Sequence, residues 1–267
     1  MDWIQASIIA LIQGITEFLP ISSSAHLLFP SLLLGWPDQG LTFDVAVHLG
    51  SLLAVIIYLR KDLIAMLTGL RQWQQEKHLN IQATLALMLT LATLPAVFFG
   101  LVLKGWIETN ARDLWVVAVT TLVFGLLLGL ADWRSRKQDP MAAMSWRHTL
   151  YIGLAQALAL LPGTSRSGIT MTAALMLGYT RQAAARFSFL MSIPIILAAA
   201  SLTGVELAMG VLVIDWGLML LAFFVSFVSA WLCIVLFMQV ISRIGMWPFA
   251  VYRIILGVGL CWLILPI

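Results

Sequence analysis

Two short polar segments interrupt an otherwise apolar chain, and both carry residue types that handle phosphate. The first, TEFLPISSSAH at residues 16–26, holds the carboxylate of Glu17, three consecutive serines and His26. The second, PGTSRSG at residues 162–168, holds an arginine among hydroxyls and glycines. Arginine binds phosphate in bidentate fashion, and carboxylate, hydroxyl and imidazole groups serve as acids, bases or nucleophiles. This combination favours phosphoryl transfer, where positioning and charge stabilisation supply most of the catalysis.

Spacing indicates how the first segment presents its groups. Gln13 and Glu17 are four residues apart and share one helix face. Pro20 is expected to end that helix, and the following serines stand where N-caps belong. His26 falls in the first turn of the next helix, where it can act as acid, base or nucleophile. Glu17 can also hold a divalent cation, Mg²⁺ or Ca²⁺, with waters completing the shell.

The second segment is typical of an anion-binding loop. It stands at the start of a helical arm, where backbone N–H groups and the helix dipole favour an anion. Its glycines, Gly163 and Gly168, permit close backbone approach. Its remaining side chains supply a fixed cation and three hydroxyls: Arg166, Thr164, Ser165 and Ser167.

Each of these groups also has a purely structural interpretation. The serines can cap a helix, His26 can be a buried core histidine, and Glu17 can form a buried ion pair with Arg166. The joint occurrence of the two segments is what favours the chemical interpretation over these alternatives.

Four further ionisable residues are expected at membrane depth, where such groups are costly and usually functional: Asp44, His48, Arg186 and Arg253. Asp44 and His48 form a second i, i+4 pair, which can be structural or can support the site. Arg253 is expected to pair structurally with a carboxylate.

Composition places the chain in a membrane. Of its 267 residues, 61% are hydrophobic and only 10% are charged, whereas a soluble domain is about 25% charged. The net charge of +3 is too small to argue for a nucleic-acid partner and is better explained by loop residues that face a cytoplasm. The N-terminus lacks the basic region of a cleavable signal peptide. The two cysteines show no metal or disulfide spacing.

Apolar runs predict an all-α, polytopic membrane protein. Six runs are long enough to span a bilayer: 42–59, 79–103, 114–131, 187–205, 211–238 and 248–266. Around each polar segment the apolar arms are shorter, at 3–19 with 24–35 and at 149–161 with 168–178. Such arms fall short of a hydrocarbon core about 30 Å thick. Each pair therefore predicts a re-entrant helical hairpin with a buried polar tip.

The two halves of the chain predict an inverted repeat within a single membrane domain, residues 1–267. FLPISSS at 18–24 aligns with LLPGTSR at 160–166 at an offset of 142. The repeats are expected at about 1–135 and 145–267. Basic residues place segments 60–78 and 132–148 in the cytoplasm. The hairpins then enter from opposite faces, a known transporter design with a site near the midplane.

Several stretches make the chain similar to the undecaprenyl-diphosphate phosphatase family of the bacitracin-resistance type. They are QGITEFLPISSSAH, PGTSRSG, FDVAVHLGSLLAV, LPAVFFG, RFSFLMSIP and PFAVYR, and together they cover nearly the whole chain. The resemblance implies an enzyme of the bacterial inner membrane. That enzyme removes the terminal phosphate of a C55 isoprenoid diphosphate, recycling the carrier lipid of peptidoglycan synthesis. Its overproduction is associated with bacitracin resistance, since bacitracin sequesters the diphosphate lipid.

The resemblance also implies roles for particular residues. It gives Glu17, Ser23, His26 and Arg166 as catalytic, with Ser23 the usual nucleophile candidate and Ser23 or His26 attacking phosphorus. The expected substrate-binding residues are Gln13, Ser22, Ser24, Gly163, Thr164, Ser165 and Ser167. Many relatives have glutamate at the position of Gln13, which weakens a two-carboxylate metal site here. The common SSTGH is SSSAH in this chain.

Other functions stay open at this point. An inverted-repeat transporter or flippase of lipid phosphates would use the same two tips without a nucleophile. An intramembrane serine protease would leave the arginine unexplained. We expect a polyprenyl diphosphate and the bilayer as partners, no nucleic acid, and a site facing the periplasm. A homodimer is one alternative for the oligomeric state.

Overall fold

All regular structure in the described part of the chain is helical. The computed structural model describes residues 1–36, 40–111, 113–134, 144–209 and 215–264. Six of its helices are long and apolar enough to cross a membrane. The sequence-based prediction of an all-α, multi-pass membrane protein is therefore confirmed.

The six long helices coincide with the six predicted spans, apart from shifts at their ends. They are α4 (Leu41–Tyr58), α6 (Ile81–Asn110), α7 (Leu114–Arg134), α10 (Arg181–Met209), α11 (Trp216–Ile244) and α12 (Trp247–Ile264). The largest extensions beyond the apolar runs are at the ends of α6 and α11 and at the start of α10. There the helices continue into polar residues, so the apolar runs alone underestimate their length.

Short helices flank both polar segments, as expected. Around the first lie α1 (Trp3–Phe18), α2 (Ser23–Leu27) and α3 (Phe29–Leu34). Around the second lie α8 (Trp146–Ala157), the 3-10 turn η2 (Leu158–Leu160) and α9 (Arg166–Met176). The arm predicted at 24–35 is broken between α2 and α3. Pro30 stands in the first turn of α3, and its ring nitrogen cannot donate to a carbonyl one turn back.

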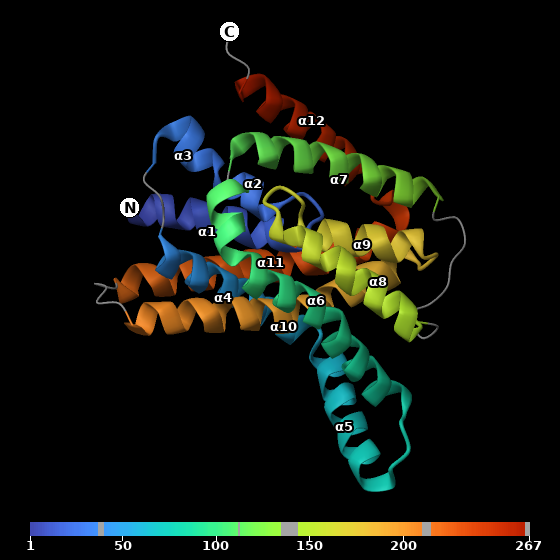
Figure 1. Ribbon diagram of the computed structural model, residues 1–267. Helices are drawn as coiled ribbons and strands as arrows, with labels where there is room; N and C mark the ends of the chain where they lie inside the picture. The colour runs from blue at the N-terminus through green and yellow to red at the C-terminus, as the bar shows by residue number, and fades with distance from the viewer. Residues whose placement is uncertain (37–39, 112, 135–143, 210–214, 265–267) are drawn as a thin grey trace.

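Helix α5 (Arg60–Glu76) occupies most of the basic segment 60–78 and leaves the main bundle, as Figure 1 shows. It packs mainly against α6, burying little besides Met66 and Gly69. The second basic segment, 132–148, contains Arg136 and Lys137, which lie outside the described residues.

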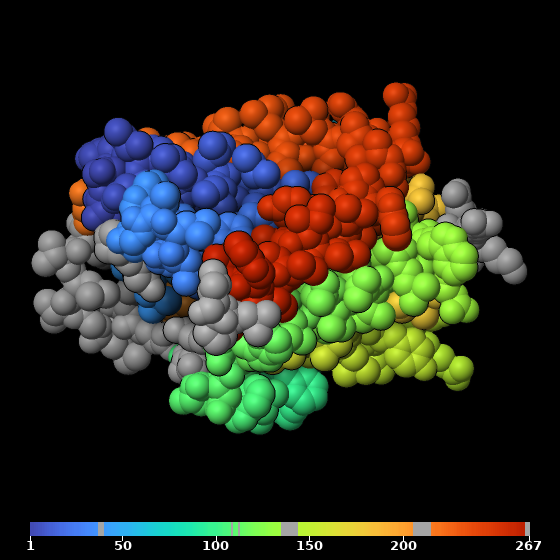
Figure 2. Space-filling model, turned by 90° about the horizontal axis from the view of Figure 1, so that it is seen from above, coloured from blue at the N-terminus to red at the C-terminus, as the bar shows by residue number. Residues whose placement is uncertain are grey.

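The long helices pack in pairs that join distant parts of the chain. Helix α11 packs against both α1 and α4, α12 packs against α7, and α8 packs against α6. In Figure 2, α12 lies between α7 and the α1–α3 segment. Glycines permit the closest approaches: a Cβ on Gly14 would lie 1.9 Å from Ser229 Oγ, and one on Gly50 would lie 2.3 Å from the Phe223 carbonyl oxygen. Small residues at helix interfaces are how membrane helices achieve tight packing.

Candidate active site

Two polar tips, residues 19–24 and residues 162–168, meet inside the bundle. The hydroxyl of Ser24 accepts a hydrogen bond from the Gly163 N–H at 3.2 Å, and the hydroxyl of Ser167 donates to the Leu19 carbonyl at 2.9 Å. Helices α1 and α8, which lead to the two tips, begin at opposite ends of the bundle in Figure 1. The two segments that sequence analysis singled out are therefore brought together, as the chemical interpretation requires.

The two tips share one local geometry. Ser22 and Ser165 are the N-caps of α2 and α9, and both adopt a positive φ, 75° and 68°. Each hydroxyl accepts from the N–H three residues ahead and contacts the serine hydroxyl two residues ahead, at 3.1 Å and 3.2 Å. Non-glycine residues rarely adopt a positive φ, and such strain clusters at functional sites.

This geometry corrects the sequence alignment by one residue. The offset of 142 pairs Ser23 with Ser165, whereas the N-caps pair Ser22 with Ser165. The second tip has one more residue between its proline and its cap, so motif letters alone misalign the helices. The first residues of the two helices, Ser23 and Arg166, thus correspond, and both line the same cavity.

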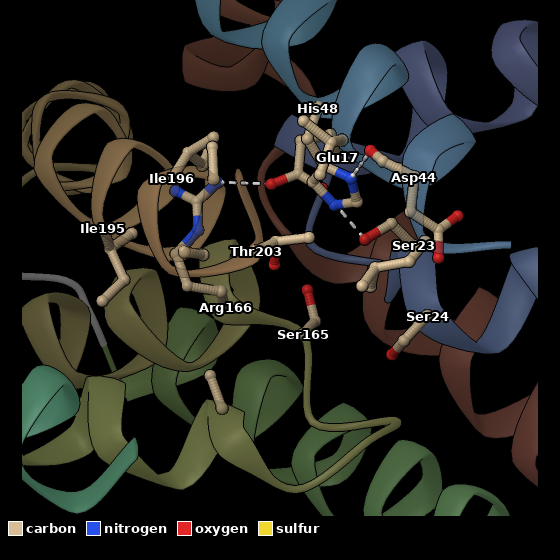
Figure 3. Close-up of a pocket in the computed structure, with 15 residues that line it drawn as sticks. Glu17, Ser23, Ser24, Asp44, His48, Ser165, Arg166, Ile195, Ile196 and Thr203 are labelled. Atoms are coloured by element: carbon tan, nitrogen blue, oxygen red, sulfur yellow. Dashed lines mark hydrogen bonds and ion pairs between the residues drawn. The ribbon is translucent and has the colours of Figure 1, made fainter. Parts of the chain in front are cut away.

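The carboxylate of Glu17 lies at the centre of the site (Figure 3). Its Oε1 accepts from Arg166 Nη2 at 2.9 Å. Its Oε2 accepts from Gln13 Nε2 and from Ser23 Oγ, both at 3.0 Å, and His48 Nε2 lies 3.9 Å from the same oxygen. A hydroxyl, an amide, an imidazole and a guanidinium thus converge on one carboxylate.

Arg166 is held by more than this ion pair. Its Nη1 donates to the Ser188 carbonyl at 3.2 Å, and its guanidinium lies 5.9 Å from the centre of the Phe18 ring. The side chains of Glu17 and Arg166 are only 8% and 14% exposed. Removing one member of a buried ion pair leaves an uncompensated charge, so these two residues depend on each other.

Helices α7 and α12 fix the second tip from behind. Thr120 donates to the Pro162 carbonyl at 2.6 Å, and Thr121 donates to the Gly163 carbonyl at 3.2 Å. Arg253, which is fully buried, donates to the same Gly163 carbonyl at 2.9 Å and to the Thr121 carbonyl at 3.3 Å. The expectation that Arg253 pairs with a carboxylate is wrong, because within the described residues its hydrogen bonds go to main-chain carbonyls.

A cavity of about 370 Å³ opens onto this cluster. Five of the predicted site residues line it: Glu17, Ser23, Ser24, Ser165 and Arg166. The other predicted residues lie behind them. Gln13 supports Glu17, while Ser22, Gly163 and Ser167 hold the tips in shape. Thr164 is fully buried.

His26 is buried beside the cavity and does not line it. Its Nδ1 lies 2.7 Å from the Ser22 carbonyl, and its Nε2 lies 2.6 Å from the Tyr252 hydroxyl. Its ring stacks on that of Tyr252 and meets the edge of Phe29. Both nitrogens of this histidine are therefore engaged in joining α2 to its own cap and to α12.

The histidine that lines the cavity is His48 of α4, together with Asp44 one turn earlier. His48 Nδ1 lies 2.6 Å from the Asp44 carbonyl. A carbonyl oxygen only accepts, so Nδ1 carries a proton and Nε2 is the nitrogen directed toward Glu17 and Ser23 (Figure 3). The i, i+4 spacing of Asp44 and His48 and their apolar surroundings were sequence signals for these residues, but they left the role open.

Within the described residues, Glu17 is not part of a cluster of side chains that could hold a divalent cation by themselves. Within the described ranges, no three His, Cys, Asp or Glu side chains are grouped in a way that could hold a metal. Both oxygens of Glu17 already accept hydrogen bonds from protein donors.

Comparison with known proteins identifies the family. The family model described as "Bacitracin resistance protein BacA" matches residues 6–259. The chain belongs to the BacA family. Within it, a protein of Alcanivorax borkumensis named undecaprenyl-diphosphatase is 56% identical over 264 residues, covering 98% of this chain and all of that one. A protein of the same name from Chromohalobacter salexigens is 54% identical over 263 residues, covering 97% of this chain and 98% of its own. The resemblance noted in the sequence is confirmed.

Proposed function

We propose that this protein is a membrane-embedded phosphatase that hydrolyses undecaprenyl diphosphate to undecaprenyl monophosphate and phosphate. The observation that carries the proposal is the convergence of Ser23 and Arg166, from two tips, on the carboxylate of Glu17 within one cavity. Membership of the BacA family and relatives named undecaprenyl-diphosphatase support the substrate. Because the reaction consumes the lipid that bacitracin sequesters, overproduction of the protein is expected to raise bacitracin resistance.

Arg166 and the start of α9 bind the terminal phosphate. The guanidinium offers several donors in a fixed fork, and the backbone N–H groups at the first turn of an eleven-residue helix favour an anion. Ser165 and Ser24 line the same wall. His48 of α4 lines the same cavity, with its Nε2 directed toward Glu17.

Ser23 rather than His26 is the proposed nucleophile, because Ser23 lines the cavity and already donates to Glu17. Its Oγ forms a bond to the terminal phosphorus as the bond from that phosphorus to the bridging oxygen breaks. Undecaprenyl monophosphate leaves with the bridging electron pair. The hydroxyl proton passes to Glu17 Oε2, which then carries it as a carboxylic acid beside Arg166.

Water completes the reaction. A water oxygen attacks the phosphorus of phosphorylated Ser23, the bond to Oγ breaks, and inorganic phosphate leaves. Glu17 returns its proton to Oγ, and both protons of the attacking water remain on the released phosphate. Serine and carboxylate are thus restored to their starting states.

The proposed setting is the bacterial inner membrane, with the cavity facing the periplasm. In the same proposal α1–α3 and α8–α9 are re-entrant hairpins of two inverted repeats. Two observations support it: the matching caps at Ser22 and Ser165, and the matching packing of α1 on α11 and of α8 on α6. Helix α1 has sixteen residues, about 24 Å in length, too short to cross a core of roughly 30 Å.

Two further expectations stay predictions. A divalent cation would have Glu17 as its carboxylate ligand, and no step of the proposed reaction passes through it. A homodimer would be seen as a doubled mass in light scattering of the detergent-purified protein.

The test is phosphate release from undecaprenyl diphosphate by detergent-purified protein, with and without EDTA. Wild type is compared with Ser23→Ala, His26→Ala, Glu17→Gln and Arg166→Ala. We expect release by wild type and losses of at least about a hundredfold for Ser23→Ala and Arg166→Ala, because each removes a group that contacts the reacting phosphate. A phosphorylated intermediate should form in wild type and be absent in Ser23→Ala.

Contrary results have distinct meanings. If Ser23→Ala stays active while His26→Ala is dead, the nucleophile assignment fails. If folded wild type releases no phosphate, the enzyme proposal fails, and the two tips become a binding site for a transported lipid phosphate. Activity lost in EDTA and restored by Mg²⁺ or Ca²⁺ would establish the cation.

A further inference from the structure

The cavity has two chemically different parts. Its inner part presents charged and hydroxyl side chains, those of Glu17, Ser23, Ser165 and Arg166. Its remaining lining is mainly apolar and comes largely from α10 and from Leu41 and Val45 of α4, with Asp44 and His48 of α4 among the polar exceptions. An anionic head group would be favoured beside Arg166, and an apolar tail beside the α10 residues.

The apolar wall follows the helical repeat of α10. Ile196, Ala199, Ala200 and Thr203 line the cavity at spacing i, i+3, i+4 and i+7, which places them on one face of the helix. Two of the four are alanines, so the wall leaves room beside the helix. Leu197, on another face of the same helix, is 45% exposed and does not line the cavity.

The cavity volume limits what it can contain. About 370 Å³ is near the lower end of pockets that hold a drug-sized molecule. Such a volume accommodates a diphosphate with the first isoprene units of a chain, whereas eleven units exceed it. Most of an undecaprenyl chain must therefore lie outside the cavity, in the bilayer.

A second apolar groove is an alternative site for the isoprenoid chain of the substrate. It lies between α1 and α11 and is lined by Leu11, Ile15, Leu232 and Leu236, among others. The groove reaches the first tip at Leu19, but none of the charged residues of the site lines it. The α10 wall, in contrast, is continuous with Arg166 and Ser165 in one cavity.

We infer that the α10 face formed by Ile196, Ala199, Ala200 and Thr203 is the subsite for the first isoprene units of the lipid substrate. This inference rests on the proposed function and adds where the isoprenoid chain of the substrate lies on the protein. The diphosphate lies against Arg166, the proximal units lie along the alanines, and the remaining units continue into the membrane. Chain length beyond these units then contributes little to recognition.

The experiment places a larger side chain on the α10 face and varies the length of the isoprenoid chain of the substrate. Ala200→Phe is assayed with dimethylallyl, farnesyl and undecaprenyl diphosphates, which carry one, three and eleven isoprene units. The control on the same helix is Leu197→Phe, and the control in the competing groove is Leu236→Phe. If Ala200→Phe does not fold, Ala199→Leu replaces it as a smaller obstruction.

We expect Ala200→Phe to lower kcat/KM for farnesyl and undecaprenyl diphosphates by a similar factor of about ten or more, mostly through KM, because apolar contact with the chain is lost. Dimethylallyl diphosphate should lose less than about threefold, and both controls should behave as wild type.

Three results would overturn the inference. An equal loss on all three substrates would mean that the wall shapes the phosphate site. A loss in Leu236→Phe but not in Ala200→Phe would place the chain in the groove between α1 and α11. No loss in either variant would leave the chain without a protein subsite. Failure of the proposed function is distinct from these, because wild type would then release no phosphate from any of the three.

Discussion

Glu17 accepts hydrogen bonds at both carboxylate oxygens, and the donors come from opposite halves of the chain. Arg166 is 149 residues away in sequence, whereas Ser23 and Gln13 are near neighbours. A carboxylate with this many donors is held in one orientation. Its Oε2 therefore stays directed toward Ser23, the geometry that a base for that hydroxyl requires.

Substitution of His48 tests which property of this side chain matters. If His48 donates a hydrogen bond to substrate phosphate, His48→Gln should keep activity within about threefold, since the glutamine amide is also a donor. His48→Ala should lower kcat/KM by about tenfold, mainly through KM, because one charge-assisted hydrogen bond is lost. Steady-state kinetics of phosphate release measure both.

The matched pair at the other histidine is His26→Gln and His26→Ala. Because His26 does not line the cavity, its variants should change thermal stability more than KM. If His48→Gln is as inactive as His48→Ala, the imidazole transfers a proton and the binding role is wrong.

The sequence predicted the right segments but favoured His26, whereas the histidine that lines the cavity is His48. Glu17, Ser23 and Arg166 were predicted from residue type and motif, and all three meet in the cavity. His26 was favoured over His48 because it stands inside the motif. The positive φ at Ser22 sets the direction of α2, and it turns His26 toward Tyr252. Spacing along a chain carries no information on such a turn.

At the scale of elements, the second tip depends on a close backbone approach. Gly163 has a φ of +87°, and a Cβ at this position would lie 2.3 Å from Thr120 Oγ1 and 2.4 Å from the Val117 carbonyl oxygen. Its own carbonyl accepts from Thr121 and Arg253. The tip therefore has little freedom to shift away from α7.

Gly163→Ala should abolish most activity and lower the melting temperature, because the clash displaces the tip that carries Arg166. The control is Gly178→Ala. Gly178 also has a positive φ, +91°, but no atom lies within 4 Å of a Cβ there. Gly178→Ala should destabilise the protein by only about 1 kcal/mol, through backbone strain, and should keep its activity. Equal effects in the two variants would show that backbone conformation, rather than packing on α7, is what matters.

The elements themselves were largely predictable. Six spans and the short arms follow from apolar run length, because a bilayer requires a minimum span. Helix α5 was not predicted as a helix, since the sequence argument used segment 60–78 only for its charge. The predicted repeat rests on motif letters, and the N-caps of the two tips differ from its register by one residue, because the position of a cap depends on backbone geometry.

At the scale of the whole molecule, α11 joins the two halves through contacts at two glycines. Gly14 of α1 and Gly50 of α4 both approach its backbone. In addition, Ser226 donates to the Val47 carbonyl at 2.7 Å. The first half of the chain is thus held against the second by backbone-level packing on both α1 and α4.

Gly50→Ala should destabilise the protein by about 1–3 kcal/mol, since an added methyl has no space against the Phe223 carbonyl. Gly259→Ala on α12, where no atom lies within 4 Å of a Cβ, is the control and should be neutral. Thermal unfolding in detergent measures both. A neutral Gly50→Ala would mean that α4 and α11 can separate without cost.

The pairing of Glu17 with Arg166 also bears on how the protein is made. Arg166 follows Glu17 by 149 residues in the chain, so a ribosome inserts the acidic tip into the membrane long before its basic partner exists. Until α9 emerges, the nascent chain carries a carboxylate without its cation and a serine without a phosphate-binding partner. The site is therefore incomplete during synthesis. It is complete only after α9 has been inserted and Arg166 has paired with Glu17. A chain that stops before α9 would lack Arg166 and the second tip. Such fragments should be degraded by membrane quality control and should have no partial activity.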